Sequence, residues 1–232
     1  MTSSAKLLRD RGANDLDGRW LEAALLTFVY CVIAGIFSAT VSAGAELFIP
    51  HIGSVFTLLL LPMGWGYSMT FLANHRKEDN DPFRVGHLLD GYQDFVRILL
   101  TILLEYIYIV LWLCLLIIPG LIKSLSYSMT LFILRDYKEL KYNGAIDLSM
   151  AMMEGHKWDL FWLYLTFIGW AILCIFTLGI GYFWLQPYMT STMANFYEEV
   201  KAEYMGKVFG EQSTASEGQT NTFESNYSKS ER

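Results

Sequence analysis

Three stretches of this sequence contain nearly the same residues: WGYSMTFLANHRK at 65–77, LSYSMTLFILRDYK at 125–138 and QPYMTSTMANFYEE at 186–199. Their shared tyrosines, Tyr67, Tyr127 and Tyr188, follow one another at intervals of 60 and 61 residues. Each stretch also ends an apolar run. A shared motif at nearly constant spacing predicts an internal repeat of three units.

The apolar runs indicate a membrane protein. Of the 232 residues, 53% are hydrophobic and 17% are charged, against roughly a quarter charged in a soluble domain. A bilayer core needs roughly 20 apolar residues per spanning helix. We therefore predict an all-α polytopic membrane protein with six transmembrane helices, at Ala23–Ala43, Ile52–Ala73, Ile98–Ile118, Leu121–Leu134, Leu160–Phe176 and Gly181–Phe196.

The first run raises the alternative of a cleaved signal peptide, because Val41-Ser42-Ala43 resembles a cleavage site. Signal cores are about 7–15 residues long and follow a short, positively charged leader. Here the apolar run is longer, and acidic residues dilute the charge of the leader. We expect the first run to remain as a membrane span.

The basic residues predict an orientation. Lys and Arg occur in the leader, after the second and fourth runs, and in the tail. The alternate connections, at 46–51, Pro119-Gly120 and 177–181, contain none, and Lys123 is the one basic residue out of place. Short loops rich in Lys and Arg stay in the cytoplasm. Both termini are therefore expected in the cytoplasm. Separately, the net charge of −6 indicates no nucleic-acid partner.

The repeat and the orientation together predict three parallel hairpins, related by an axis along the membrane normal. Each hairpin follows a segment with a Gly and an aromatic residue: Gly18-Arg19-Trp20, Gly91-Tyr92 and Gly155 with Trp158. Two of these segments, Phe83–Arg97 and Asn143–Trp158, carry apolar residues at helical spacing. We predict amphipathic interfacial helices, which either cover the hairpin ends or dock a lipid or a partner.

The last residues differ in composition from the rest of the chain. From Glu211 onward Ser, Thr, Glu, Gln and Asn predominate, and such a segment cannot bury a hydrophobic core. The predicted organisation is an integral membrane domain at residues 1–205 and a disordered polar cytoplasmic tail at residues 206–232.

No catalytic or metal-binding motif occurs in the sequence. The four histidines lie in separate loops, and the three cysteines lie in apolar runs. Neither set has the spacing of a metal site or a nucleophile with its base. We therefore expect no cofactor, no metal and no enzymatic activity.

Polar residues inside the predicted spans are the remaining candidates for a site. Glu105 is the one acid well inside a span, and intramembrane acids are functional candidates by default. The alternative is that Glu105 only packs, through a hydrogen bond to a neighbouring helix. The candidate intramembrane polar site comprises Glu105, Thr101, Tyr108, Tyr127, Ser128, Thr130, Tyr67, Thr70 and Tyr188.

Four stretches resemble a known family: IIPGLIKSLSYSM at 117–129, AIDLSMAMMEGHKWDLF at 145–161, FIGWAILCIFTLGIGYFWLQPYM at 167–189 and TMANFY at 192–197. They are similar to a bacterial integral membrane family known as domain of unknown function 975. The resemblance is specific over Ile117–Tyr197, and Gly18-Arg19-Trp20 and Leu88–Phe95 extend it. It implies a multi-span protein of the bacterial inner membrane, distantly like the membrane domains of some glycerophosphodiesterases, with no established activity.

These observations favour a non-catalytic role in envelope maintenance or in recruiting a lipid or protein partner at the cytoplasmic face. The bilayer itself is the expected environment. One alternative is a small-solute transporter or channel with a polar site around Glu105. Another is a membrane domain that once served a lipid-cleaving partner enzyme.

Overall fold

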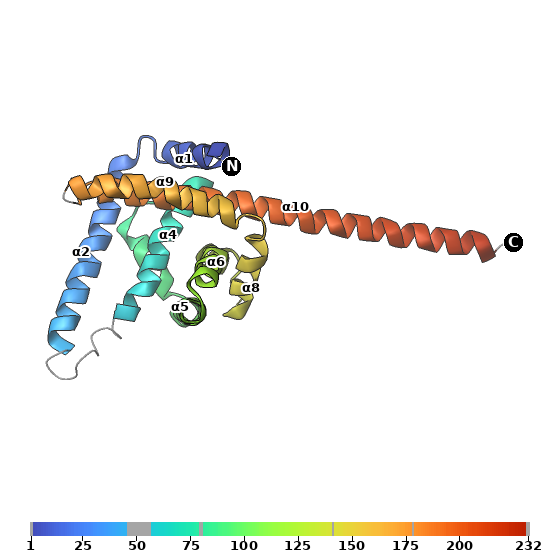
Figure 1. The fold of residues 1–232 in the computed structure, drawn as a ribbon, viewed down its shortest axis with the longest axis horizontal. Coiled ribbons are helices and arrows are strands. Elements are labelled where there is room, and N and C mark those ends of the chain that lie inside the picture. Colours follow the sequence, from blue (N-terminus) through green and yellow to red (C-terminus); the bar gives the residue numbers. More distant parts are fainter. Residues whose placement is uncertain (1, 46–56, 79–80, 141, 178, 231–232) are drawn as a thin grey trace. The chain divides into compact units, whose positions relative to one another are not determined.

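The computed structural model describes residues 2–45, 57–78, 81–140, 142–177 and 179–230. Within these residues every regular element is a helix, in agreement with the predicted all-α class (Figure 1). The elements are α1 (Thr2–Asp15), α2 (Trp20–Ala45), η1 (Thr57–Leu60), α4 (Leu61–Arg76), η2 (Val85–Tyr92), α5 (Phe95–Leu115), α6 (Ile117–Tyr127), α7 (Thr130–Asp136), α8 (Asn143–Met152), α9 (Lys157–Phe176) and α10 (Tyr182–Ser230).

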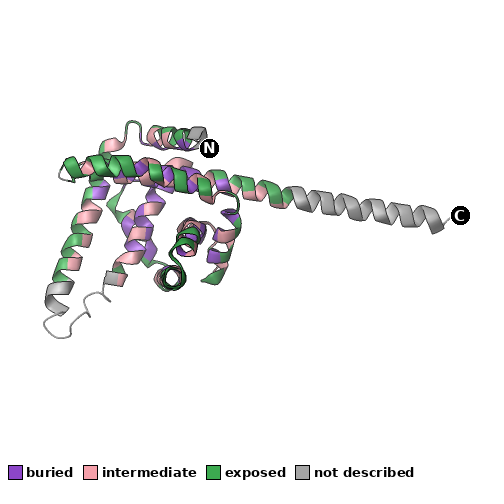
Figure 2. Cartoon of the chain, viewed as in Figure 1, coloured by how far each residue is buried: buried purple, intermediate pink, exposed green. Residues whose placement is uncertain are grey.

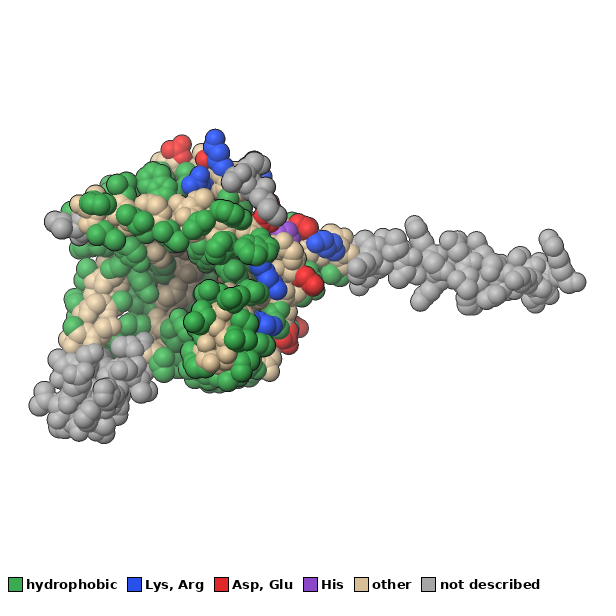
Figure 3. Space-filling view, in the orientation of Figure 1, with side chains coloured by type: hydrophobic (Ala, Val, Ile, Leu, Met, Phe, Trp, Pro, Cys, Tyr) green, Lys and Arg blue, Asp and Glu red, His purple; other side chains and the backbone are tan. Residues whose placement is uncertain are grey.

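Four helical segments of the described residues are long and apolar enough to cross a bilayer: Trp20–Thr40, Phe95–Leu115, Ile117–Asp136 and Lys157–Phe176. Less than half of each is buried within the protein. Large apolar side chains accordingly cover the outer surfaces of α2 and α9, while charged side chains gather near α1 (Figure 3). Apolar surface of this extent indicates a membrane protein.

The other two expected spans, Ile52–Ala73 and Gly181–Phe196, are not among these four segments. At 16 residues α4 is about 24 Å long at 1.5 Å per residue, which is short for a bilayer core. Residues 52–56 of the second expected span, and its expected turn at 46–51, lie outside the described residues. The number of six spans therefore stays a prediction.

The turn between α5 and α6 lies earlier than Pro119-Gly120. Leu116 alone joins the two helices, with an extended backbone at φ −158° and ψ 133°. Gly120 falls in the first turn of α6, where a Cβ would lie 2.6 Å from the Leu113 side chain. The glycine is therefore needed for the close approach of the two helices, whereas Leu116 makes the reversal.

The segment Ile117–Asp136 is interrupted at Ser128 and Met129, between α6 and α7. Ser149 of α8 stabilises this break. Its hydroxyl donates to the Ser126 carbonyl at 2.8 Å and accepts the Met129 N–H at 3.2 Å. Because Ser149 is fully buried, these bonds satisfy backbone groups that water cannot reach.

One cluster of the hydrophobic core lies between the linker after α1, the first turns of α2, α4 and η2. It contains Leu16, Ala23, Leu26, Met63, Tyr67, Phe71, Phe83 and Leu88. Most of the α4 surface is accordingly buried (Figure 2). The Tyr67 ring stacks on Tyr30 with centroids 5.0 Å apart, so the first of the three repeated tyrosines is a core residue.

The segment Phe83–Arg97 is not one amphipathic α-helix. It forms the 3-10 helix η2 from Val85 to Tyr92, and α5 begins at Phe95. Leu88 and Gly91 are buried against α4, while Val85 and Leu89 are exposed. Leu88 is buried as the periodicity predicted, but the apolar residues expected on the same face are not buried together, and the periodicity could not predict the tighter helix that lets Gly91 approach the Pro62 carbonyl.

The chain divides into two compact units, Met1–Tyr197 and Glu198–Arg232. In the second unit α10 continues to Ser230, and Lys207 Nζ pairs with Glu203 Oε1 at 2.7 Å. The expected boundary at residue 205 and the disorder of residues 206–232 stay predictions.

Candidate functional site

Within the described residues, Glu105 on α5 is not hydrogen-bonded to Tyr127 or Ser128, two candidates at the end of the neighbouring helix α6. The Tyr108 ring, one turn after Glu105, lies 6.5 Å from the Tyr127 ring. The Ser128 hydroxyl donates to the Leu125 carbonyl at 2.8 Å instead.

Three further candidates bond to other groups. The Thr101 hydroxyl donates to the Arg97 carbonyl at 2.8 Å. Tyr108 Oη donates to Asn143 Oδ1 at 3.0 Å, and Thr130 Oγ1 donates to the Tyr127 carbonyl at 2.7 Å. The first and third bonds are local, to carbonyls four and three residues earlier, and Thr101 Oγ1 also accepts the Tyr142 N–H at 3.3 Å. Thr101 and Thr130 therefore bond to backbone groups rather than to each other.

Tyr67, Thr70 and Tyr188 lie in a separate region. The Tyr67 and Thr27 hydroxyls are 2.9 Å apart, and Thr70 Oγ1 donates to the Tyr67 carbonyl at 2.7 Å. The Tyr188 ring packs against Trp20 and Phe167, with centroids 6.1 and 5.4 Å away. The structure therefore does not bring the nine candidate residues together in one cluster.

A different set of residues does converge, at the ends of α4, α7 and the first part of α10. Arg76 donates two parallel hydrogen bonds to Asp136, Nη1 to Oδ1 at 2.7 Å and Nη2 to Oδ2 at 2.6 Å. Tyr197 Oη donates to the same Asp136 Oδ2 at 2.8 Å. Burial, together with the negative charge of Asp136, raises the pKa of the Tyr197 phenol above its ordinary value. Tyr197 thus remains a donor to the carboxylate at neutral pH.

These three residues occupy the same position in the three repeated stretches. Arg76, Asp136 and Tyr197 each stand nine residues after the shared tyrosine, Tyr67, Tyr127 or Tyr188. This triad was not predicted from the sequence because its three residues differ in type. The sequence feature that could have identified the triad is the common distance of nine residues from the repeated tyrosine.

A second convergence involves Asp15 at the end of α1. Asn74 Nδ2 donates to the Asp15 carbonyl at 2.7 Å, and Asn195 Nδ2 donates to Asp15 Oδ2. The two asparagines each stand seven residues after a shared tyrosine. His75 Nδ1 also lies 2.8 Å from Asp15 Oδ2. Asp15 therefore joins α1 to both α4 and α10.

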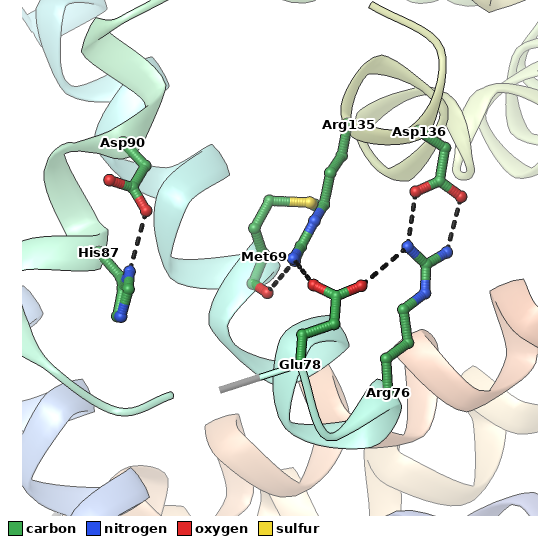
Figure 4. Close-up of polar contacts among 7 residues, drawn as sticks. All are labelled: Met69, Arg76, Glu78, His87, Asp90, Arg135 and Asp136. Carbon is green, nitrogen blue, oxygen red and sulfur yellow. Dashed lines mark hydrogen bonds and ion pairs between the residues drawn. The ribbon is translucent and has the colours of Figure 1, made fainter. Parts of the chain in front are cut away.

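Further ion pairs connect Arg76 of the triad to Arg135, the residue before Asp136 in α7. Glu78 lies between Arg76 and Arg135 and bonds to both (Figure 4). Arg135 Nη1 also donates to the Met69 carbonyl at 2.6 Å. Carboxylates and guanidinium groups thus alternate from Asp136 to Arg135, so that each partly buried charge has a partner.

A pocket of about 430 Å³ lies beside this network, between α4, η2, the start of α5 and the end of α7. Its lining carries charges of both signs, together with His87 and a few apolar side chains. The basic residues are Arg97, Arg135 and Lys138, and the acidic residues are Glu78, Asp90 and Asp94. Of the nine sequence candidates only Thr70 lines this pocket.

With this geometry in view, we compared the chain with known proteins. Residues 113–204 match the family described as "Protein of unknown function (DUF975)". The resemblance predicted over Ile117–Tyr197 is thereby confirmed. No curated protein and no solved structure gives a significant match. The extension to Gly18-Arg19-Trp20 and Leu88–Phe95, and the distant likeness to glycerophosphodiesterase membrane domains, stay predictions.

The DUF975 segment contains one part of the site. Asp136, Tyr197, Arg135 and Lys138 lie within it, whereas Arg76, Glu78 and the η2 residues precede it. The triad and the pocket therefore each combine residues of the segment that matches DUF975 with residues of the preceding chain.

The residues that the structure describes form no metal-binding site. No group of three or more His, Cys, Asp or Glu side chains there is arranged to hold a metal ion. Most charged groups of the pocket lining have partners: Asp94 pairs with Arg97 at 3.0 Å, Glu78 pairs with Arg135, and His87 Nδ1 lies 3.0 Å from Asp90 Oδ2. This arrangement can bind charged groups of a ligand.

Proposed function

We propose that this chain is a non-catalytic protein of the bacterial inner membrane, with six spans arranged as three parallel hairpins. Both termini and the polar ends of the hairpins face the cytoplasm. There the protein recruits a lipid or protein partner and contributes to envelope maintenance. The observation that carries the binding role is the pocket with three basic and three acidic residues beside the triad.

The triad supports the three-hairpin arrangement. In a protein built from parallel repeats, equivalent residues of each repeat approach one another near the common axis. Arg76, Asp136 and Tyr197 are equivalent by their distance from the repeated tyrosines, and they share one cluster of hydrogen bonds. If the sequence repeat were a coincidence, there would be no reason for these three residues to lie in contact.

The packing of the segments that precede each hairpin gives independent support. η2 packs on α4, and α8 packs on α6 and α7, so each covers the second helix of the preceding hairpin. α1 precedes the first hairpin and contacts α10, where the Ser191 hydroxyl donates to the Gly12 carbonyl at 3.0 Å. Each preceding segment thus packs on the second helix of a hairpin: η2 on that of the first, α8 on that of the second and α1 on that of the third.

The cytoplasmic orientation rests on the basic residues near the pocket. Arg76, Arg97, Arg135 and Lys138 all lie at the triad end of their helices. The opposite turn, at Leu116, has no Lys or Arg within six residues on either side. Positively charged ends of short loops remain in the cytoplasm during insertion.

Complementation of a deletion strain tests the binding role. We expect the double variant Lys138→Gln/Asp90→Asn to accumulate in the membrane, because both side chains are on the surface, yet fail to rescue the deletion phenotype. Glu105→Gln should rescue it. Full rescue by the pocket variant, at equal protein level, would contradict the proposed role.

A second candidate function, transport of a small solute, is favoured by one observation. The segment Ile117–Asp136 is broken at Ser128–Met129, and broken helices form the substrate sites of many transporters. Glu105 lies one turn before Tyr108, which contacts Tyr127 next to this break. Loss of rescue in Glu105→Gln, with the pocket variant active, would favour transport.

A further inference from the structure

The pocket beside the triad separates its charges in a way that fits a dipolar ligand. The acidic Asp90 and Asp94 come from η2 and the residue before α5, whereas Arg135 and Lys138 come from the end of α7 and the loop after it. The two other charged residues of the lining are paired across this division, Arg97 with Asp94 at 3.0 Å and Glu78 with Arg135. Figure 4 shows the His87–Asp90 pair on one side and the Glu78–Arg135 pair on the other. A ligand with one positive and one negative group can satisfy both sides.

The basic side of the pocket has one cation that is available for a ligand. Arg97 is committed to the fold, since it donates to the carbonyls of Leu134 and Leu140 at 3.0 and 3.3 Å. Arg135 is held by Met69 and Glu78. Lys138 is exposed and makes no ion pair within the described residues. Its ammonium group is therefore suited to bind a phosphate.

On the acidic side, the Asp90 and Asp94 side chains are each 47% exposed, and each is paired within the protein: Asp90 Oδ2 lies 3.0 Å from His87 Nδ1, and Asp94 Oδ2 accepts from Arg97 Nη2 at 3.0 Å. A carboxylate has about four acceptor sites, so each can accept further hydrogen bonds. A primary ammonium group donates three hydrogen bonds, which carboxylates accept well. A quaternary ammonium donates none and is bound by cages of aromatic faces. Trp65 is the one aromatic residue in the pocket lining. This lining favours a primary ammonium group.

A second hollow extends the pocket toward apolar surface. It has a volume of about 550 Å³ and shares Gln93, Asp94, Arg97 and Lys138 with the first pocket. Its lining adds Phe95 and Val96, and the Val96 side chain is 61% exposed. A ligand with acyl chains can therefore leave the charged pocket over apolar side chains, as lipids do at a membrane interface.

We propose that this pocket binds the headgroup of a phospholipid that carries a primary ammonium group. Lys138 binds the phosphate, Asp90 and Asp94 bind the ammonium group, and the acyl chains leave over Phe95 and Val96. This inference rests on the proposed function, because it requires the pocket to lie at the membrane interface. It specifies the lipid that the protein recruits.

Native mass spectrometry of the full chain, released from detergent micelles, tests the inference. The probes are dihexanoyl forms of phosphatidylethanolamine, phosphatidylcholine and phosphatidylglycerol, together with glycerophosphoethanolamine, which has the headgroup without chains. We expect phosphatidylethanolamine to bind at least about tenfold more tightly than each of the others. A difference of this size is the effect of one charge-assisted hydrogen bond.

Matched variants assign the binding to the pocket. Lys138→Gln and Asp90→Asn should each weaken phosphatidylethanolamine binding about tenfold, the effect of one charge-assisted hydrogen bond. Lys6→Gln and Asp81→Asn, which change exposed residues outside the pocket, should leave it unchanged. Circular dichroism melting of every variant checks that the fold is retained.

Three results would overturn the inference. Preference for phosphatidylglycerol would mean that only positive charge attracts the lipid. Equal binding of glycerophosphoethanolamine would mean that the ligand is a free solute. Equal effects of pocket and control variants would place binding elsewhere. Each result leaves the complementation experiment unaffected, so a failed rescue by the pocket variant would still support recruitment of another partner.

Discussion

Asp136 is the residue on which the three repeated stretches converge. Its side chain is 8% exposed, and it accepts two hydrogen bonds from Arg76 and one from Tyr197. A carboxylate this buried is stable only while its charge is compensated. The surrounding packing therefore depends on Arg76 remaining in place.

Removing the charge of Asp136 should destabilise the protein. We expect Asp136→Asn to lower the free energy of unfolding by about 2–3 kcal/mol, the range for hydrogen bonds to charged groups. Denaturant titration in detergent measures this change. Asp81→Asn is the control, because its pair with Arg84 spans 3.9 Å and both side chains are more than 60% exposed. Similar losses in the two variants would contradict the role assigned to Asp136.

A second prediction for a single residue concerns Glu105. Because no hydrogen bond links it to α6 in the described residues, its replacement by an amide of the same shape should change little. We expect Glu105→Gln to keep its melting temperature in detergent, and Glu105→Leu to cost no more than about 1 kcal/mol, the value of one interhelical hydrogen bond in lipid. A folded Glu105→Gln protein that loses activity would instead assign Glu105 a transport role.

Among the elements, η2 shows what periodicity cannot predict. The helical spacing of apolar residues over Phe83–Arg97 indicated an amphipathic helix. Leu88 is buried in agreement with it, whereas Leu89 and Val96 of the same expected face are exposed. The 3-10 geometry depends on close packing against α4, which is a tertiary contact. A Cβ on Gly91 would lie 2.1 Å from the Pro62 carbonyl oxygen, and one on Gly66 would lie 2.7 Å from the His87 oxygen.

This contact can be tested with two glycines of the same element. Gly91→Ala should cost about 3 kcal/mol, the upper range for overpacking, because it presses on backbone atoms that cannot move independently. Gly86→Ala meets no atom within 4 Å and should be neutral or slightly stabilising, since Gly is unfavourable in helices. Thermal unfolding in detergent compares them. Equal melting temperatures would mean that η2 does not pack on α4 as described.

For the whole molecule, the sequence predicted the helical class and four of the six expected apolar segments. Those features depend on composition and local spacing, which a single sequence records directly. The triad and the pocket were not predicted, because Arg76, Asp136 and Tyr197 meet only after the chain has folded. Lys123, the one basic residue that does not fit the predicted orientation, lies over the Trp112 ring with its Nζ 5.3 Å from the centroid. The cation–π contact with Trp112, on the preceding helix α5, orients the Lys123 side chain.

The central claim is that the triad and the pocket lie at the cytoplasmic ends of membrane-spanning hairpins. The most direct test labels single cysteines with an impermeant maleimide, in a variant whose native Cys31, Cys114 and Cys174 are replaced. Lys138→Cys marks the pocket, and Ile118→Cys marks the opposite turn, where the side chain is 73% exposed. In intact cells we expect labelling of Ile118→Cys and none of Lys138→Cys, with the reverse in inverted membrane vesicles. Labelling of Lys138→Cys in intact cells would contradict the account.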